Sequence, residues 1–172
     1  MAQVNFNKNG LVFITKKSGT AVSSIDIDNC FSNKYIQYRI ITDVTSSIAN
    51  IAVNAQYRSG GVTTTSGYSY QYMIGSTTVV VGARATSQSS AAYIGGTKST
   101  NVSEIAVTEI RNPFQTQYTT AITFMAQESS GTINSDVFSN STSATTSFDG
   151  IRILPSSGNI TGTVYVYAYV NS

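Results

Sequence analysis

The chain is predicted to be all-β: an antiparallel, jelly-roll-like β-sandwich of about ten strands. Short runs rich in β-branched and aromatic residues recur at intervals of roughly 8–15 residues, with turn residues between them. No apolar segment keeps the 3.6-residue period long enough to form a helical crossover. Charged residues make up only 10% of the 172 residues, against about 25% in typical domains, which disfavours long solvent-exposed helices. A chain of this length is most simply one domain.

The N-terminal half is expected to form an arm and six strands. Residues 1–9 are polar and rich in Asn, which is typical of a flexible arm, so the sandwich domain is assigned to 10–172. Each expected strand ends at a turn signal, such as Ser18-Gly19-Thr20 after the first and Ser59-Gly60-Gly61 after the fourth. The six strands are 10–16, 22–27, 35–44, 51–58, 68–74 and 77–84, and the last two are expected to pair with each other.

The C-terminal half is expected to add five strands, at 91–94, 102–110, 118–126, 147–154 and 160–170. The segment 102–110 also fits a helix, but its apolar residues are β-branched and turn residues flank it, which favours a strand. Residues 132–146 are low in hydrophobic residues, so no strand is expected there. The last two strands flank Pro155-Ser156-Ser157-Gly158-Asn159, and this arrangement predicts a closing β-hairpin.

Tyrosines are the enriched residue type that suggests a binding role, with eleven present and no tryptophan. Because side chains alternate along a strand, two sets each share one face: Tyr68, Tyr70 and Tyr72, and Tyr165, Tyr167 and Tyr169. Stacked tyrosines bind sugar rings or other proteins, but they also pack across sheets. We expect the second set to be largely buried, in the fold or against a neighbouring subunit. The first set is a candidate ligand platform.

Catalytic chemistry is disfavoured by the residue types available. The chain has no histidine, which removes Ser-His and Cys-His nucleophilic catalysis and the usual zinc ligands. Two facing carboxylates would suit glycoside hydrolysis, but Glu104 and Glu109 lie five residues apart on one strand and point to opposite faces. Asp26 and Asp28 offer oxygen ligands to calcium, yet turn or capping roles are favoured for them. We therefore expect no enzymatic activity, catalytic residue, metal or cofactor.

Nucleic-acid and membrane partners are also not expected. The net charge of +2 arises from ten scattered Lys and Arg residues, which form no basic stripe to neutralise phosphates. No run approaches the roughly 20 apolar residues of a membrane span, and the N-terminus does not resemble a signal peptide. The single cysteine, Cys30, rules out an internal disulfide and is expected to be a small apolar core residue.

Four segments, taken in order and spacing, resemble a module of tailed-bacteriophage structural proteins, found in tail and fibre proteins of marine and cyanobacterial phages. They are Gly-Leu-Val-Phe-Ile at 10–14, Cys-Phe-Ser-Asn-Lys-Tyr-Ile-Gln-Tyr-Arg-Ile at 30–40, Ser-Phe-Asp-Gly-Ile at 147–151, and Ile-Thr-Gly-Thr-Val-Tyr-Val-Tyr-Ala-Tyr at 160–169. The likeness covers residues 10–171. The chain departs from the family pattern at Ile36, where Asp is usual, and at Ala168, where Gly is usual.

The resemblance implies a non-enzymatic β-sandwich of the virion, made in the host cytoplasm and assembled as a homo-oligomer, with a trimer favoured. Its expected partners are other virion proteins. Tail or fibre placement is expected first. The alternatives are a capsid decoration or cement protein, or a carbohydrate- or receptor-binding module that attaches to a host surface glycan.

Overall fold

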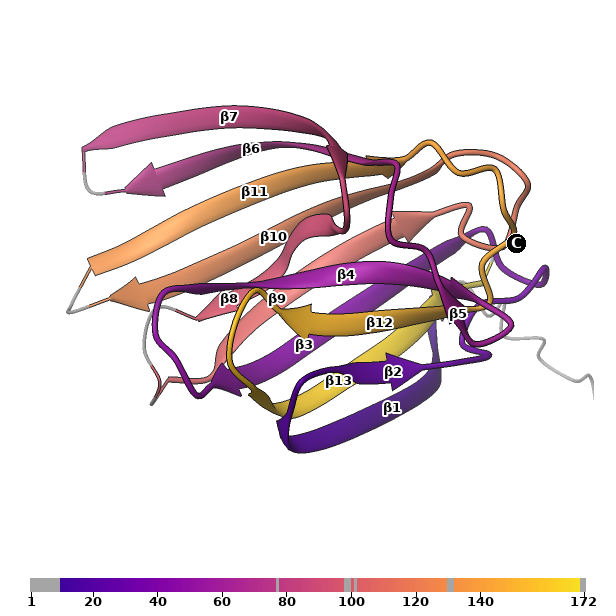
Figure 1. Cartoon of the computed structure of the whole chain (residues 1–172), viewed down its shortest axis with the longest axis horizontal. Coiled ribbons are helices and arrows are strands. Elements are labelled where there is room, and N and C mark those ends of the chain that lie inside the picture. The colour runs from indigo at the N-terminus through magenta and orange to yellow at the C-terminus, as the bar shows by residue number, and fades with distance from the viewer. Residues whose placement is uncertain (1–9, 77, 98–99, 101, 130–131, 171–172) are drawn as a thin grey trace, which may run out of the picture.

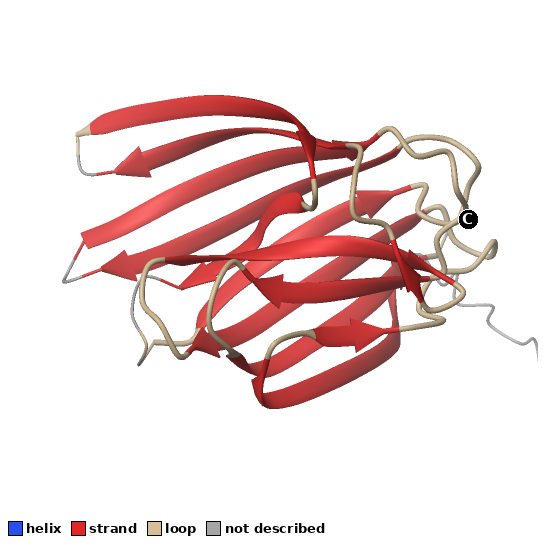
Figure 2. Ribbon diagram, in the orientation of Figure 1, coloured by secondary structure: helices blue, strands red, loops and turns tan. Residues whose placement is uncertain are grey.

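The computed structural model describes residues 10–76, 78–97, 100, 102–129 and 132–170, and every regular element among them is a β-strand (Figures 1 and 2). All strand pairs are antiparallel, and the strands form two sheets packed face to face. The predicted all-β, antiparallel sandwich is therefore confirmed. The predicted arm, residues 1–9, lies outside the described residues.

The large sheet has eight strands, and its order explains where its two edges lie. From one edge to the other the strands are β1 (Leu11–Val22), β13 (Ile160–Tyr169), β3 (Gln37–Ser46), β9 (Glu104–Arg111), β10 (Thr119–Ser129), β11 (Thr132–Thr142), β6 (Tyr68–Ser76) and β7 (Val79–Gln88). The strands β9, β10 and β11 form a meander, and β6 and β7 form a hairpin. The predicted pairing of the strands around 68–74 and 77–84 is confirmed.

The small sheet covers one face of the large sheet and closes the core. Its strands are β2 (Ile25–Ile27), β12 (Gly150–Pro155), β4 (Ile51–Ser59), β5 (Val62–Thr63) and β8 (Ala91–Thr97). Alternate residues of both sheets point inward, as in Val164, Val166 and Ala168 of β13, which are fully buried. Figure 1 shows the β6–β7 hairpin reaching beyond the area that the small sheet covers.

The predicted closing hairpin is wrong. The strand β12 pairs with β2 and β4 in the small sheet, whereas β13 pairs with β1 and β3 in the large one. The segment between them therefore crosses from one sheet to the other. The jelly-roll connectivity is not confirmed, since a jelly roll is built from two Greek keys and the large sheet contains a meander and a hairpin.

Two further strand predictions need correction. The strand β1 continues through Ser18-Gly19-Thr20 to Val22, because bulges at 13–15 and 19–22 absorb the irregularity that was interpreted as a turn. The strand β11 occupies a segment where no strand was predicted. Its inward-facing residues include Asp136, Asn140 and Thr142, all buried, so the apolar alternation that normally indicates a strand is absent.

Candidate functional site on the outer face of the large sheet

The outer face of the large sheet carries an apolar row that crosses six adjacent strands. Cross-strand pairing places its members side by side, because residues opposite each other in an antiparallel ladder point to the same face. Phe124 is 49% exposed and Met73 is 55% exposed. We call this row the apolar band; its members, in spatial order, are Tyr165, Ile41, Val107, Phe124, Val137 and Met73.

A shallow depression of about 350 Å³ lies at the centre of the apolar band, between Ile105, Phe124 and Val137. Ile105 is 56% exposed and extends the apolar surface beyond the band itself. Ala126 and Ser135 border the same depression, so small side chains surround the large ones. This arrangement offers a recess into which an apolar side chain of a partner protein fits.

Beside the band, the same strands form a polar trough of about 640 Å³. Two cross-strand rows line it. The first contains Glu109, Ile122, Ser139, Gln71 and Arg84, and the second contains Gln37, Arg111, Thr120, Ser141 and Ser69. Short hydroxyl side chains lie in the middle of the trough, and arginines lie toward its two ends. Hydroxyl, amide and guanidinium groups in one concave surface suit a polar ligand.

Glu109 anchors a cluster of hydrogen bonds beside the trough. Arg39 Nε donates to Glu109 Oε1 at 2.7 Å, and the Tyr169 hydroxyl donates to the same oxygen at 2.8 Å. Arg39 Nη2 donates to the Tyr169 hydroxyl at 2.7 Å. Burial, reinforced by the neighbouring Glu109 carboxylate, raises the pKa of Tyr169. The second carboxylate oxygen, Glu109 Oε2, is buried without a hydrogen bond from the described residues.

The three tyrosines of β13 lie on the outer face and are half-buried. Tyr167 packs edge-on against Phe13, with ring centroids 5.6 Å apart, and Tyr169 belongs to the Glu109 cluster. The expectation that Tyr165, Tyr167 and Tyr169 are largely buried is not met within the single chain. Each of the three rings keeps part of its surface exposed.

The second tyrosine set faces the interior of the sandwich and does not form an exposed platform. Tyr68 is fully buried. Its hydroxyl accepts from the Tyr57 N–H at 2.8 Å and donates to the Thr64 carbonyl at 3.0 Å, while burial raises its pKa to about 12. Tyr70 and Tyr72 are half-buried and stack on each other at 6.2 Å. Tyr68 is thus a structural residue, and the ligand platform predicted from this face is wrong at that position.

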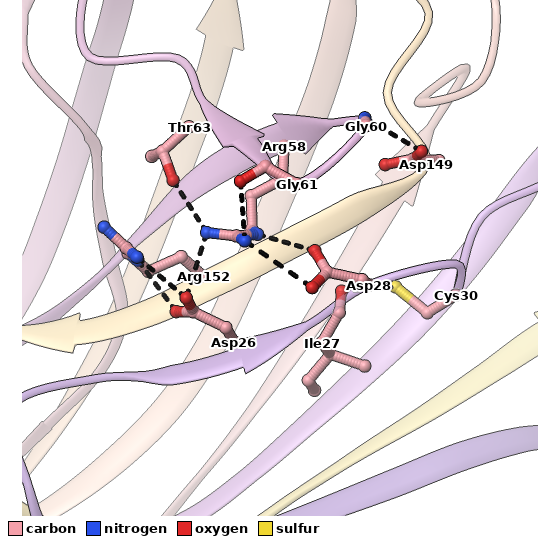
Figure 3. A network of polar contacts seen from close by, with 10 residues as sticks. All are labelled: Asp26, Ile27, Asp28, Cys30, Arg58, Gly60, Gly61, Thr63, Asp149 and Arg152. Atoms are coloured by element: carbon pink, nitrogen blue, oxygen red, sulfur yellow. Dashed lines mark hydrogen bonds and ion pairs between the residues drawn. The ribbon is translucent and has the colours of Figure 1, made fainter.

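Asp26 and Asp28 are neutralised by arginines on the outer face of the small sheet (Figure 3). Arg152 donates to both oxygens of Asp26 at 2.7 Å, and Arg58 Nη1 lies 2.9 Å from Asp26 Oδ2. Arg58 Nε donates to Asp28 Oδ1 at 2.7 Å. Hydrogen bonding to Arg152 is the largest cause that lowers the pKa of Asp26. Carboxylates held in this way are structural, and the described residues contain no cluster suited to a metal ion.

The segments that resemble phage proteins lie at structural positions. The Asp149 carbonyl accepts from the Phe31 N–H at 3.0 Å, and the Tyr38 hydroxyl accepts from the Ser32 N–H at 2.8 Å. A Cβ on Gly162, whose φ is +149°, would lie 2.7 Å from the Val44 Cα. These contacts position strands and turns. The same segments also reach the outer face, since Gln37 lines the trough and Tyr165 belongs to the band.

Sequence reasoning missed both surfaces of the outer face. Each depends on strands that are distant in the chain, and β11, which contributes Val137, Ser139 and Ser141, was not predicted. The signal available was the alternation in 118–126, which places Thr120, Ile122 and Phe124 on one face. Glu104 and Glu109 do point to opposite faces, as predicted, since Glu104 is buried and Glu109 lines the trough.

The described residues include no helix that is long and apolar enough to span a membrane. Comparisons of the chain with protein-family models, with curated protein sequences and with solved structures found no match. The case for function therefore depends on the outer face of the large sheet and on the sequence resemblance.

Proposed function

We propose that this chain is a structural protein of a tailed-bacteriophage virion, an oligomeric surface module that belongs to the tail. Its function is assembly. The core of the sandwich provides a rigid platform, the apolar band contacts neighbouring subunits or other virion proteins, and the hydroxyl-rich remainder of the surface faces solvent or host.

The apolar band is the observation that carries this proposal. Soluble monomers rarely expose a large contiguous apolar patch, and such patches mark interaction sites. Phe and Met are enriched at protein interfaces while Lys and Glu are depleted. Along the band, Phe124 and Met73 are about half-exposed, and Ile105 borders them. A partner that covers this row would also complete the burial of Tyr165.

The virion setting is supported by the resemblance of the four segments to phage proteins. Those segments fix the backbone, as in the Phe31–Asp149 hydrogen bond, and a structural protein is expected to keep residues of this kind. The absence of histidine from the sequence agrees with a role that requires no general base.

A matched pair of variants on β10 tests the assembly role. Phe124→Lys places a charge in the apolar band, whereas Thr120→Lys places the same charge four residues away on the same face, in the trough. Both side chains are exposed, so both variants should fold. Size-exclusion chromatography with light scattering should show an oligomer for the wild type and Thr120→Lys, and a monomer for Phe124→Lys.

The virion setting is tested separately by peptide mass spectrometry of density-purified particles. Peptides of this chain should be present in stoichiometric amounts. A wild-type chain that stays monomeric at every concentration and is missing from particles would contradict the proposal.

The polar trough favours a second function, attachment to a host surface glycan. Arginine, amide and hydroxyl groups line the trough, and this combination of donors and acceptors suits the hydroxyl groups of a sugar. Binding of host polysaccharide, measured by glycan array or calorimetry, should be lost in Thr120→Lys. If the wild-type chain binds none of the host polysaccharides tested, this role is excluded.

A further inference from the structure

The two edges of the large sheet differ in how well they are protected from pairing with another strand. An edge strand presents unpaired N–H and C=O groups, and proteins block such edges with lysines, bulges, short strands or covering elements. The edge strand β1 carries Lys16 and Lys17, both exposed, and two bulges interrupt it. That edge is therefore unsuited to further pairing.

The edges of the small sheet are blocked in other ways. The strands β2 and β5 have three and two residues, which is too short to template a partner strand. The strand β8 packs against β9, β3 and β10 of the large sheet, and its residues Ile94, Gly95, Gly96 and Thr97 are buried. Neither kind of edge is accessible to a strand from outside.

The strand β7 is the exception at its N-terminal half. Val79, Val80 and Val81 are 57%, 73% and 49% exposed, so both faces of this edge are apolar. The other half of the strand is protected, because Arg84 is exposed and a bulge with positive φ at Ser87 disrupts the register with β6. The unprotected stretch is Val79–Ala83, and it lies on the hairpin that reaches beyond the small sheet (Figure 1).

We propose that β7 pairs antiparallel with β7 of a second copy of this chain, which joins two large sheets into one continuous sheet across a two-fold axis. Backbone N–H and C=O groups on an open edge are satisfied best by another strand. Two identical strands that pair antiparallel are related by a two-fold axis, so each copy contributes the same surface to a closed interface.

The charge and the valines of β7 together select the register of this pairing. An axis at Arg84 would place the two guanidinium groups opposite each other, which is destabilising. An axis at Val80 sets Val79 against Val81 of the other copy and separates the two Arg84 residues by eight positions. At about 3.4 Å per residue this distance is roughly 27 Å, well beyond the Debye length of about 8 Å at physiological salt. An axis at Val81 would also keep the arginines about 20 Å apart, but it would set Val80 against Gly82. Only an axis at Val80 sets each of the three valines against a valine, and cross-strand pairs of β-branched residues stabilise a sheet, so we place the axis at Val80.

Single cysteine variants measure both the contact and its register. Directly opposed residues have Cβ atoms about 4.5–5.5 Å apart, so Val80→Cys should form an intermolecular disulfide under mild oxidation. Val79→Cys and Val81→Cys face valine in this register and should cross-link far less. Ile133→Cys, 68% exposed on β11, is the control for random collision. Cys30 is buried and remains unreactive.

Val80→Lys provides the complementary test, because it places two ammonium groups together at the axis. The protein concentration at which half of the Val80→Lys chains are dimeric, measured by light scattering, should be at least about tenfold higher than for the wild type. The same concentration for Ile133→Lys should match the wild type. The proposal fails if Val80→Cys cross-links no faster than Ile133→Cys, or if Val80→Lys associates like the wild type.

The β7 contact and the assembly role of the apolar band fail independently. An oligomer lost in Phe124→Lys but kept in Val80→Lys would reject the β7 contact and retain the assembly role. In the alternative outcome, the wild type and Phe124→Lys are both dimeric while Val80→Lys is monomeric, and the chain is missing from virions. This combination of results would support the β7 contact and reject the proposed function. A wild-type mass of three chains that is unchanged in Val80→Lys also rejects the two-fold contact.

Discussion

Replacing Arg58 with Met should destabilise the small sheet measurably, because Arg58 connects three of its strands. Its guanidinium contacts Asp28 on one side, Asp26 on another, and the Thr63 hydroxyl and Gly61 carbonyl at 2.8 and 2.7 Å (Figure 3). The Arg58 side chain is only 8% exposed. Methionine keeps much of the apolar stem that packs on the sheet and removes the charged contacts.

The size of the stability loss depends on how well Asp26 and Asp28 remain neutralised once Arg58 is gone. Removing one partner of a fully buried ion pair costs about 3–5 kcal/mol. Here Asp26 keeps both hydrogen bonds from Arg152, and the Asp28 side chain is 42% exposed, so solvent screens its charge. We expect a loss of about 2 kcal/mol in the free energy of unfolding. For a chain of this length, that corresponds to a decrease in melting temperature of about 4–8 °C.

Urea denaturation monitored by far-UV circular dichroism measures this loss, with Arg111→Met as the control at an exposed arginine. The difference between wild type and Arg58→Met should also narrow in acid. The pKa of Asp26 is lowered below its ordinary value of 3.8, chiefly by the hydrogen bond from Arg152 and in smaller part by the charge of Arg58. The stabilisation is therefore complete above that value and is lost as pH falls through the lower pKa of the folded state. An unchanged midpoint at pH 7 would refute the assigned role of Arg58.

Three further predictions concern the scaffold. Gly162→Ala should cost about 1–3 kcal/mol in unfolding free energy, because its Cβ would meet the Asp43 carbonyl and Val44 Cα. Gly10→Ala, which has open space, should be neutral in the same melts. Tyr68→Phe should cost about 1–3 kcal/mol, since it leaves a buried backbone N–H without its acceptor; an unchanged melting temperature would contradict this. Cys30, whose pKa burial raises to about 12, should react with a thiol reagent only in denaturant.

The buried face of β13 was predictable because the pattern that indicates it lies within the strand itself. Valines and alanine at every second position indicated one buried face, and those residues are buried. The tyrosine face was harder to predict, because period two shows which residues share a face without showing whether a second layer covers it. The sequence led us to expect a buried Tyr165 and a Tyr68 available to a ligand, yet Tyr68 lies in the core and Tyr165 lies on the outer face.

The pairing partners of the strands could not be read from local sequence. The segments 147–154 and 160–170 have the composition and spacing of a hairpin, and the same features suit a crossing between two sheets. Arg58 illustrates a related limit. It lies on the polar side of β4, where alternation alone favours exposure, but Asp26 and Asp28 from a distant segment surround it. Both results depend on contacts between residues far apart in the chain.

The apolar band and the polar trough are adjacent surfaces, so a partner bound to the band would also border the trough. Ile122 of the trough and Phe124 of the band are two residues apart on β10, about 7 Å along the strand. A partner sheet packed on the band at the usual spacing of about 10 Å would form a wall along that side of the trough. Assembly would then convert an open surface into a cleft.

Glycan affinity is therefore expected to depend on oligomerisation if both proposed functions hold. Phe124→Lys leaves every trough residue in place, so an isolated trough would bind host polysaccharide as the wild type does. A trough completed by a neighbouring subunit would bind at least about tenfold more weakly in this variant, because one wall of contacts is lost. Calorimetry on the wild type at concentrations above and below its association midpoint provides the control without any substitution. Equal affinity in all these samples would show that the trough acts within a single chain.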